Sequence, residues 1–571
     1  MEKEGIEQQI IDYIENNEKE DYNEIIHKDN RIKIIQALSD IRENIVSWYP
    51  FKENSEILEI GADFGQITGY LCEKSKNVVS LEKSAGKRKA ILKRHKKFKN
   101  LKVIDNIENL QQKFDYITLI GMENITDEPK NMLIILKKYL KEDGKILIAT
   151  DNKMGIQYFC RVDERGENIT NFINKKLYTL IDLEKIINEV GFENLNVYFP
   201  MPDYKLTNVI YTREKPISLN NLSRNIVYNE ENSIKFYEQN NFFKEILNNK
   251  ELIELYMNSF FIEIFNGKYE KVKIKLVLFS NIRKTKYRIK TIIKEREVYK
   301  YPALVESKNH IEKIKNNIDI IKKSNLNILD SYDEERIISK YTRSQTFDKL
   351  IIETIKIDKN KAIELMMKFK QELSNKLEYE NKENNVFDRY GIKYDKEIIK
   401  DEIFIKNGLW DLIFQNCFFI NNKFYFFDQE WMEENIPINF IFYRAIRYLD
   451  GIKKYFSEAE LLKLLEINEN LVGLFEQLDN KLQETIKDDL IWKIHTQGKT
   501  LLDLKREKLT DNNTINLLKI ENRQKENLIN QKENEIQELR DRLNSIYNSK
   551  SWKITQALRK ISNQARKDRE E

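Results

Sequence analysis

The segment Ile57–Thr68, with the sequence ILEIGADFGQIT, constrains the fold of this chain more than any other stretch. Its apolar residues run into Glu59, then Gly61 and Gly65, and then a helix-forming sequence. Glycines at the end of a buried strand let the backbone turn tightly and let a ligand approach it without a Cβ in the way. The segment therefore predicts a strand, a ligand-binding turn and a helix, in that order.

Strand-forming and helix-forming sequences continue to alternate after this segment. The apolar run NVVSLEKS ends in Glu82, where a carboxylate at the end of a strand can hold a ribose diol. A basic helix, two further strands, a second helix and the strand KILIAT follow, and the closing antiparallel strands are expected to end near Tyr211. The order βαβαβ predicts an α/β, doubly wound parallel sheet whose ligands bind at the carboxyl ends of the strands.

This pattern resembles the class I S-adenosylmethionine (SAM)-dependent methyltransferases, whose first motif is E-x-G-x-G-x-G and whose second strand ends in an acid. The resemblance implies that Glu59, Gly61, Gly65 and Glu82 bind SAM. Asp63 stands where the family usually has its middle glycine. Its carboxylate either meets the ammonium group of the cofactor or impairs cofactor binding. NAD binding is the nearest alternative, but its fingerprint G-x-G-x-x-G is not met here.

Two further strand ends supply candidates for the same site. Asp105 and Asn106 end the third strand, where they either face the adenine or form a simple turn. The segment Gly121–Glu123 ends the fourth strand, and it either lines the methyl-transfer pocket or is an ordinary turn.

A second site is predicted between residues 300 and 428. Asp411 and Asn416 lie in LWDLIFQNCFFI, and Asp428 ends the next strand, FYFFDQEW. The first carboxylate can accept a proton from a substrate hydroxyl, while the amide and the second carboxylate hold Mg²⁺ on the phosphates of ATP. Lys300 can pair with those phosphates, and Glu312, on a helix, can orient the lysine. The alternative is that these groups are polar caps on a hairpin.

The order of these elements resembles the kinase-like fold, nearer to sugar and small-molecule kinases than to protein kinases. The sequence departs from that pattern, because it has no glycine-rich loop, no histidine before Asp411 and no A-P-E segment. Kinase activity and substrate class stay open on these grounds.

Composition limits the kinds of partner and the cellular compartment that we expect for the protein. The net charge is only +4 because 93 acidic residues balance 97 basic ones, so the sequence gives no electrostatic footprint for nucleic acid. The three cysteines form no C-x-x-C pair, which argues against structural zinc and disulfides. No apolar stretch approaches the ~18–20 residues of a membrane span, and the first residues lack a signal-peptide core. We expect a cytoplasmic protein.

The C-terminal region predicts a coiled coil followed by a short amphipathic helix. A weak heptad runs over 515–547 and predicts parallel association into a homo-oligomer. The tail, SWKITQALRKI, carries apolar and basic faces. The a positions are Ile515, Asn522, Ile529, Ile536 and Leu543, and the d positions are Leu518, Lys525, Lys532, Leu539 and Ile546.

Together these observations predict a multidomain chain that combines α/β and α+β parts. Its order resembles the bifunctional kinase–methyltransferases of bacterial O-antigen biosynthesis. The resemblance implies a lipid-linked glycan or sugar acceptor, a glycosyltransferase partner for the tail and a place at the inner face of the cell membrane. The alternatives are a methyltransferase with a non-catalytic kinase-like scaffold and an RNA methyltransferase. The expected parts are a helical segment (1–39), the methyltransferase (40–215), a helical connector (222–256), the kinase-like domain (257–455), a helical region (456–510), the coiled coil (515–547) and the tail (549–571).

Overall fold

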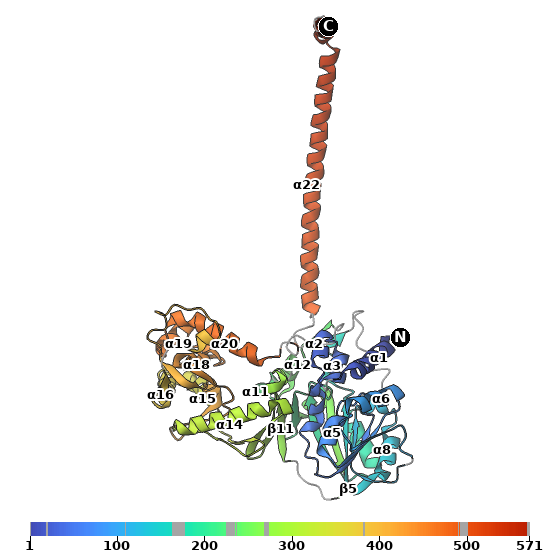
Figure 1. Ribbon diagram of the computed structural model, residues 1–571, viewed down its shortest axis with the longest axis vertical. Coiled ribbons are helices and arrows are strands. Elements are labelled where there is room, and N and C mark those ends of the chain that lie inside the picture. Colours follow the sequence, from blue (N-terminus) through green and yellow to red (C-terminus); the bar gives the residue numbers. More distant parts are fainter. Residues whose placement is uncertain are drawn as a thin grey trace. The chain divides into compact units, whose positions relative to one another are not determined.

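A computed structural model of the chain is shown in Figure 1. It describes residues 2–18, 21–108, 110–162, 177–223, 234–235, 237–267, 273–380, 383–488, 490 and 501–567. The chain divides into two compact units, Met1–Gly498 and Lys499–Glu571.

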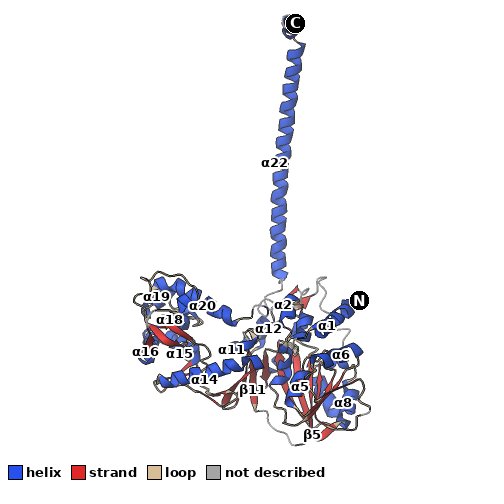
Figure 2. Cartoon of the chain, in the orientation of Figure 1, coloured by secondary structure: helices blue, strands red, loops and turns tan. Residues whose placement is uncertain are grey.

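Thirteen strands of the described residues form one mixed sheet in the first unit (Figure 2). Its order is β14-β15-β13-β12-β11-β8-β7-β10-β5-β4-β1-β2-β3. The neighbouring strands β3, β2, β1, β4 and β5 are parallel. Strand β1 lies between β2 and β4, with its Leu58 opposite both Val79 and Ile117. This confirms the predicted Rossmann-like sheet, in which the strands end at one edge. The bounds are β1 (Glu56–Ile60), β2 (Asn77–Leu81), β3 (Leu101–Ile104), β4 (Phe114–Ile120), β5 (Leu140–Asp151), β7 (Asn194–Met201), β8 (Val209–Thr212), β10 (Ser259–Phe265), β11 (Ile274–Phe279), β12 (Ile289–Lys294), β13 (Glu297–Pro302), β14 (Asp330–Tyr332) and β15 (Ile337–Lys340).

The N-terminal helices form a small core over the glycine turn. Buried isoleucines of these helices, among them Ile10 and Ile34, cluster with Phe64 of the turn and Ala90 of α6. The N-terminal segment is therefore part of the methyltransferase half. The helices of this half are α1 (Glu2–Asn16), α2 (Asn23–Lys28), α3 (Ile32–Leu38), α4 (Asn44–Ser47), α5 (Thr68–Lys74), α6 (Ala85–Arg94), α7 (Met122–Ile125), α8 (Pro129–Lys138), α10 (Leu180–Glu189), α11 (Leu219–Leu222), α12 (Gln239–Ile246) and α13 (Lys250–Tyr256).

The predicted boundary between the first two domains is wrong. We expected the methyltransferase to end at residue 215 and the segment 260–265 to open the next domain. Instead, β10 lies between β5 and β7 and is antiparallel to both, with Phe261 opposite Ala149 and Tyr198. All seven residues of β10 are buried, as expected for a strand in the middle of a sheet covered on both faces. The predicted connector also belongs to this half, because Phe243 and Ile253 lie in its core.

The second half begins on the same sheet and continues into a helical lobe. Strand β11 pairs with β8, so the hydrogen-bonded sheet runs without interruption from one half into the other. The apolar core of the helical lobe extends through Ile486, beyond the predicted boundary at residue 455. The helices and the remaining strands of the second half are α14 (Lys308–Lys323), α15 (Phe347–Ile357), α16 (Lys359–Lys376), β16 (Tyr379–Glu380), α17 (Val386–Arg389), β17 (Phe404–Gly408), β18 (Cys417–Ile420), β19 (Lys423–Phe426), β20 (Glu433–Pro437), α18 (Ile438–Arg447), α19 (Glu458–Leu464) and α20 (Val472–Ile486).

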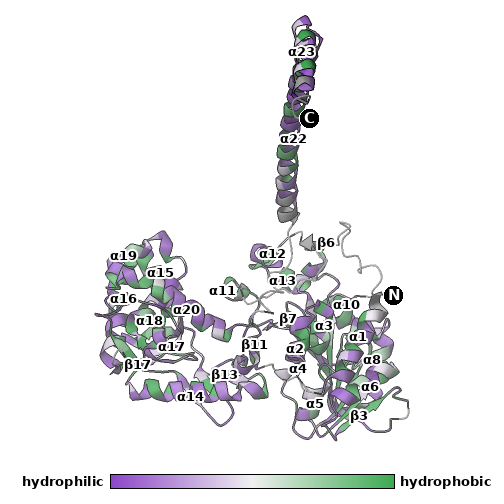
Figure 3. Ribbon diagram, turned by 45° about the horizontal axis from the view of Figure 1, so that its top comes forward, coloured by the Kyte–Doolittle hydropathy of each residue, from purple (hydrophilic) through white to green (hydrophobic). Residues whose placement is uncertain are grey.

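The second unit consists of two helices, α22 (Leu501–Asn548) and α23 (Lys550–Lys567). The predicted heptad segment lies within α22, where hydrophobic residues recur among hydrophilic ones (Figure 3). In the part of the chain that the structure describes, no helix is both long and apolar enough to span a membrane. Association through α22 stays a prediction at this point.

Candidate functional site: the glycine turn and a second polar site

The glycine turn after β1 has a backbone that requires its glycines. Gly61 and Gly65 have φ angles of +71° and +73°. A Cβ on Gly61 would lie 2.5 Å from Cδ1 of Ile125 on α7, and a Cβ on Gly65 would lie 2.9 Å from Nε2 of His95. Larger residues at either position would therefore strain the backbone and displace a neighbour. The protein side chains of Ile125 and His95 therefore fill the space beside the two glycines.

His95 supports this turn, a role that no spacing in the sequence indicates. Its Nε2–H donates a hydrogen bond of 2.7 Å to the carbonyl of Gly65. Burial lowers the pKa of His95 to about 3, so the ring is neutral and its position does not change with physiological pH.

Glu82 lies where a ribose-binding carboxylate is expected. Its Oε2 accepts from the N–H of Asp63 at 3.0 Å, and its Oε1 accepts from the N–H of Ser84 at 2.9 Å. The carboxylate at the end of β2 is thus fixed against the glycine turn.

The side chain of Asp63 points to α6 rather than into an open site. Its Oδ1 pairs with Nζ of Lys87 at 2.7 Å, and its Oδ2 accepts from Gln66 at 2.7 Å. Asp63 has a φ of +51°, a left-handed conformation that aspartate tolerates better than most residues. The carboxylate in the place of a glycine therefore has a structural partner in the protein.

Glu59 is the buried acid of the turn. Its side chain is 2% exposed, and its Oε2 accepts from Thr68 at 2.7 Å and from Ser80 at 2.5 Å. Its Oε1 has no hydrogen-bond partner among the described residues. Burial raises the pKa of Glu59 to about 7. A buried acceptor without a donor is costly, so the position fits a ligand that brings a charged donor such as an ammonium group.

The other predicted residues lie along the same edge of the sheet. Asp105 is 3.6 Å from Arg88, and Asn106 donates to Glu108; both follow β3 and are exposed. Gly121, with a φ of +86°, ends β4 and begins α7. Because parallel strands end at one edge, these positions line one side of the sheet with Gly61 and Glu82.

Glu123, in the segment that the sequence singled out, is the centre of a polar cluster whose other members were not predicted from the sequence. The hydroxyl of Tyr204 donates to Oε1 of Glu123 at 2.6 Å, and Thr150 donates to its Oε2 at 3.0 Å. Asp151, at the end of β5, pairs with Lys205 at 2.6 Å. Burial and the neighbouring Asp151 raise the pKa of Glu123. Glu123 is therefore a buried titratable group two residues beyond Gly121.

The structure brings together Lys300 and Asp428, two residues that the sequence places in one candidate site. Lys300 in β13 is 6% exposed, and its Nζ contacts Oδ1 of Asp428 and Oε1 of Glu430, the latter at 2.6 Å. Burial would raise the pKa of Glu430, but Arg283 and Lys300 hold it well below its usual range. Asp428 has a φ of +61°, and its N–H donates to the buried Asp330 at 2.8 Å.

The prediction for Glu312 is wrong. Glu312 is 62% exposed and pairs with Lys315 on the same helix at 2.7 Å. The acid beside Lys300 is Glu430 instead, which follows Asp428 by two residues in the printed sequence. Helical periodicity places Glu312 on the solvent face of α14, whereas His310 and Ile311 are buried.

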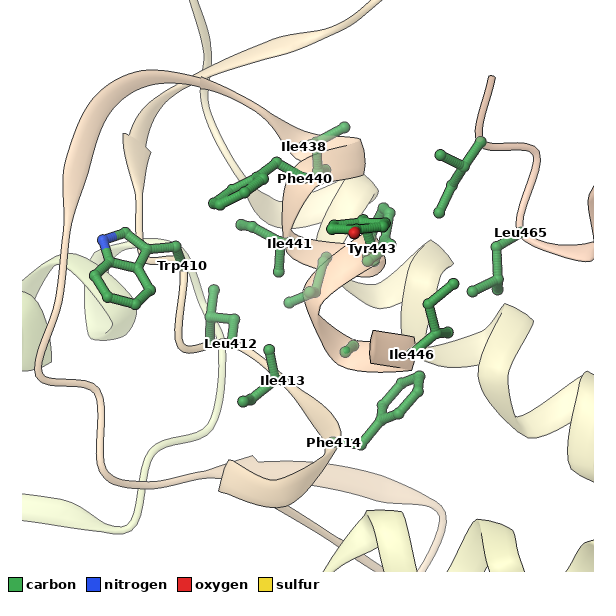
Figure 4. Packing of buried hydrophobic residues seen from close by; sticks show 14 of the residues in the cluster. Trp410, Leu412, Ile413, Phe414, Ile438, Phe440, Ile441, Tyr443, Ile446 and Leu465 are labelled. Carbon is green, nitrogen blue, oxygen red and sulfur yellow. The ribbon is translucent and has the colours of Figure 1, made fainter. Parts of the chain in front are cut away.

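Asp411 and Asn416 lie next to the loop that carries Asp428. The side chains of Asn416 and Gln429 both donate to the carbonyl of Asp411, at 3.2 and 3.0 Å. Apolar residues after Asp411, among them Leu412 and Phe414, pack beside α18 and fix the loop (Figure 4). Burial raises the pKa of Asp411 to about 6, although Arg444, 3.4 Å away, opposes the shift.

Comparisons with known proteins bear on the first site. Residues 30–197 match a family model described as a methyltransferase domain, and the chain carries a SAM-dependent methyltransferase domain there. A SAM-dependent methyltransferase from Thermotoga maritima aligns at 14% identity and a TM-score of 0.27, over 43% of this chain and 98% of that one.

Two further solved structures align with part of the chain. Phosphoethanolamine N-methyltransferase 2 from Haemonchus contortus, in complex with SAM, aligns at 17% identity and a TM-score of 0.27, over 40% of this chain and 53% of that one. A SAM-dependent methyltransferase from Aquifex aeolicus aligns at 17% identity and a TM-score of 0.23, over 30% of this chain and 90% of that one. No curated protein matches the chain.

Proposed function

We propose that the glycine turn binds SAM with its methionine end over Gly61–Gly65 and its ribose hydroxyls on Glu82. The observation that carries this proposal is the unsatisfied Oε1 of buried Glu59 below the turn. An ammonium group there supplies the missing donor and a charge that favours the ionised carboxylate. Asp63 is already paired with Lys87 and holds the turn in shape. In this proposal Asp105 and Asn106, which directly follow β3, face the adenine.

Calorimetry with SAM tests this placement. A bidentate carboxylate–diol contact is worth about 1.5–3 kcal/mol, so Glu82→Ala should weaken binding about ten- to a hundredfold. Gly61→Val should abolish binding, because its Cβ meets Ile125. Glu56→Ala is the matched control, since Glu56 is a carboxylate at the opposite end of the neighbouring strand β1. Wild-type affinity in both test variants would show that the cofactor binds elsewhere.

We propose that the second site binds ATP with Mg²⁺ and transfers phosphate to a hydroxyl. Lys300 pairs with phosphate oxygens, Asn416 and Asp428 hold the metal, and Asp411 accepts the hydroxyl proton. A pKa of about 6 suits Asp411 to accept a proton near neutral pH. Among the described residues no group of three or more His, Cys, Asp or Glu could hold a metal. Mg²⁺ at such sites uses one or two carboxylates and takes further ligands from phosphate and water.

Variants of the two aspartates separate binding from transfer. Asp428→Asn should abolish Mg²⁺-dependent ATP binding, whereas Asp411→Asn should keep binding and lose transfer, because the base acts on the acceptor. Glu312→Gln is the control, since Glu312 faces solvent and should leave ATP binding unchanged. Full transfer by Asp411→Asn would remove Asp411 from the mechanism.

A non-catalytic second lobe is the competing proposal. It is favoured by the ion pairs of Lys300 with Asp428 and Glu430, which already satisfy the groups that ATP and Mg²⁺ would engage. ATP binding without hydrolysis or transfer, in the presence of the glycan acceptor, would support this scaffold role.

We propose a lipid-linked glycan or its sugar as the acceptor of methyl and phosphate groups. This proposal rests on the resemblance of the domain order to O-antigen kinase–methyltransferases. The tail helix α23 would bind a glycosyltransferase partner at the inner membrane face through Trp552, Ile554 and Leu558. Transfer of labelled methyl from SAM to lipid-linked glycan in membranes tests the acceptor. Truncation at residue 510 should release the protein from those membranes while both sites keep their ligands.

A further inference from the structure

His310, on α14, is a buried polar residue that the proposed mechanism does not use. Its side chain is 1% exposed, and its Nε2 has no hydrogen-bond partner among the described residues. A buried ring nitrogen without a partner is rare in native structures, because it has lost contact with water without gaining a hydrogen bond in the protein. The position of this nitrogen therefore calls for an explanation.

Aromatic neighbours fix the ring of His310 beside the second site. The ring stacks on Trp431 with centroids 4.6 Å apart and planes 29° apart, and Tyr287 meets it edge-on with centroids 5.3 Å apart. In this position Nε2 of His310 lies 3.8 Å from Oε2 of Glu430. That distance is too long for a hydrogen bond, and a shift of about 1 Å would make one.

Glu430 divides its two carboxylate oxygens between different partners. Its Oε1 accepts from Nζ of Lys300 at 2.6 Å, while its Oε2 accepts from Arg283 at 2.5 Å. His310 lies on the side of Oε2. A donor at Oε2 fixes the orientation of the carboxylate group, so it also keeps Oε1 directed at Lys300. His310 can thus influence Lys300 without touching it.

Binding of ATP would change the balance of charge at Glu430. In this structure Lys300 and Arg283 together compensate the carboxylate, which is 4% exposed. In the proposed ATP complex Lys300 shares its charge with phosphate oxygens, so less of it compensates Glu430. A buried carboxylate is costly unless its charge and its hydrogen bonds are satisfied. A third donor at Oε2 therefore stabilises the site most when the nucleotide is bound.

We infer that His310 is a positioning residue of the second site, whose Nε2–H donates to Oε2 of Glu430 when ATP binds and keeps Oε1 directed at Lys300. This inference rests on the proposed ATP site. It gives α14 the task that the sequence assigned to Glu312, with the chemical roles exchanged. The acid comes from the loop between β19 and β20, and the buried face of the helix supplies the donor.

Variants at position 310 separate this role from simple packing. His310→Phe keeps an aromatic ring beside Trp431 and removes the unsatisfied nitrogen, so the melting temperature should stay the same or rise. In titrations of the full chain with a fluorescent ATP analogue and Mg²⁺, the same variant should bind roughly tenfold more weakly or worse, because a hydrogen bond to a charged group is lost. His310→Gln, whose amide can donate, should recover part of this affinity. Ile311→Val, at a buried neighbour on α14, is the packing control and should bind like wild type.

A double-mutant cycle tests whether His310 acts through Glu430. In a Glu430→Gln background, His310→Phe should cause no further loss of ATP affinity, because the acid that it positions is gone. Additive losses, or an ATP affinity that both His310 variants leave unchanged, would overturn this inference while the ATP site stands. If the wild-type chain shows no Mg²⁺-dependent ATP binding, the proposed ATP site is wrong and this inference is wrong with it.

Discussion

The buried acid Glu59 should link SAM binding to the release of a proton. Its pKa of about 7 is raised from the ordinary 4.5 by burial, so much of the ligand-free protein holds a neutral Glu59 at neutral pH. An ammonium group at the free Oε1 would favour the carboxylate instead. SAM should therefore bind best to the ionised form, and protonation should compete with it.

The magnitude follows from the pKa. If Glu59 must ionise on binding, the affinity falls tenfold for each pH unit well below 7. Between pH 7 and pH 5.5 the loss is about 15-fold, and at pH 5.5 nearly one proton should be released per SAM bound. The amine of SAM remains largely charged over this range, because α-amino groups have pKa values of about 7.7–8.0.

Stability without ligand should change with pH in the opposite sense to SAM affinity. A carboxyl whose folded-state pKa is raised favours the folded protein below its unfolded pKa, and this contribution is lost as pH rises through the folded value. For Glu59 the window runs from about 4.5 to about 7. The shift of about 2.5 units corresponds to roughly 3 kcal/mol across that window. Urea unfolding of wild type and Glu59→Gln at pH 5 and pH 8 measures the difference.

Calorimetry in two buffers of different ionisation enthalpy measures the released proton. Glu59→Gln should bind SAM with no pH dependence between 5.5 and 7 and release no proton. Glu123 also has a raised pKa near the site, and the same measurement on Glu123→Gln separates the two groups. A wild-type affinity that does not change with pH, or a slope that persists in Glu59→Gln, would refute the assignment.

Three further predictions concern other parts of the compact unit. Phe261→Ala in β10 should lower the free energy of unfolding by about 3–5 kcal/mol and reduce the rise in melting temperature that SAM produces, both measured by thermal unfolding. Phe261→Leu is the control, and an unchanged transition in Phe261→Ala would place β10 outside the methyltransferase core. Lys300→Met should abolish ATP binding in a fluorescent-nucleotide titration and leave SAM binding intact; retained ATP affinity would exclude Lys300 from the site. His95→Ala should weaken SAM binding by loosening the turn at Gly65, whereas His95→Gln, which can still donate, should recover part of it; equal affinity of both variants would rule out this support.

Local patterns made the parallel half of the sheet predictable. The glycine turn, the apolar strands and the acid at Glu82 lie close together in sequence, so periodicity and spacing reach all of them. The role of β10 could not be predicted in this way. It pairs with β5 and β7 only after the chain has passed through β8 and the helices α12 and α13, and its apolar run fits any buried strand. The predicted domain boundary at residue 215 marks the point where the alternation of strand-forming and helix-forming sequence stops. The core of the methyltransferase half continues beyond it.

The candidate sites show the same division between local and distant partners. Lys300, Asp411 and Asp428 could be proposed from the sequence because each residue type suits its chemistry at its own position. The sequence predicted an acid from a helix beside Lys300, whereas Glu430 comes from the loop between β19 and β20. The partner of Asp63 likewise could not be predicted, since Lys87 lies on α6, beyond α5 and β2 in the chain. Side-chain partners across elements depend on packing, which spacing alone does not encode.

The continuous sheet links the two sites physically. Strand β8 pairs on one side with β7 of the methyltransferase half and on the other with β11 of the second half, where Val277 lies opposite Ile210. Cutting the chain between the halves would expose β8 as an open edge with buried residues, which favours aggregation. Both sites are therefore expected to share one cooperative fold, so SAM should slow hydrogen exchange in β11 as well as in β1. If SAM does not change the rate of hydrogen exchange in β11, the two halves unfold independently despite their shared sheet.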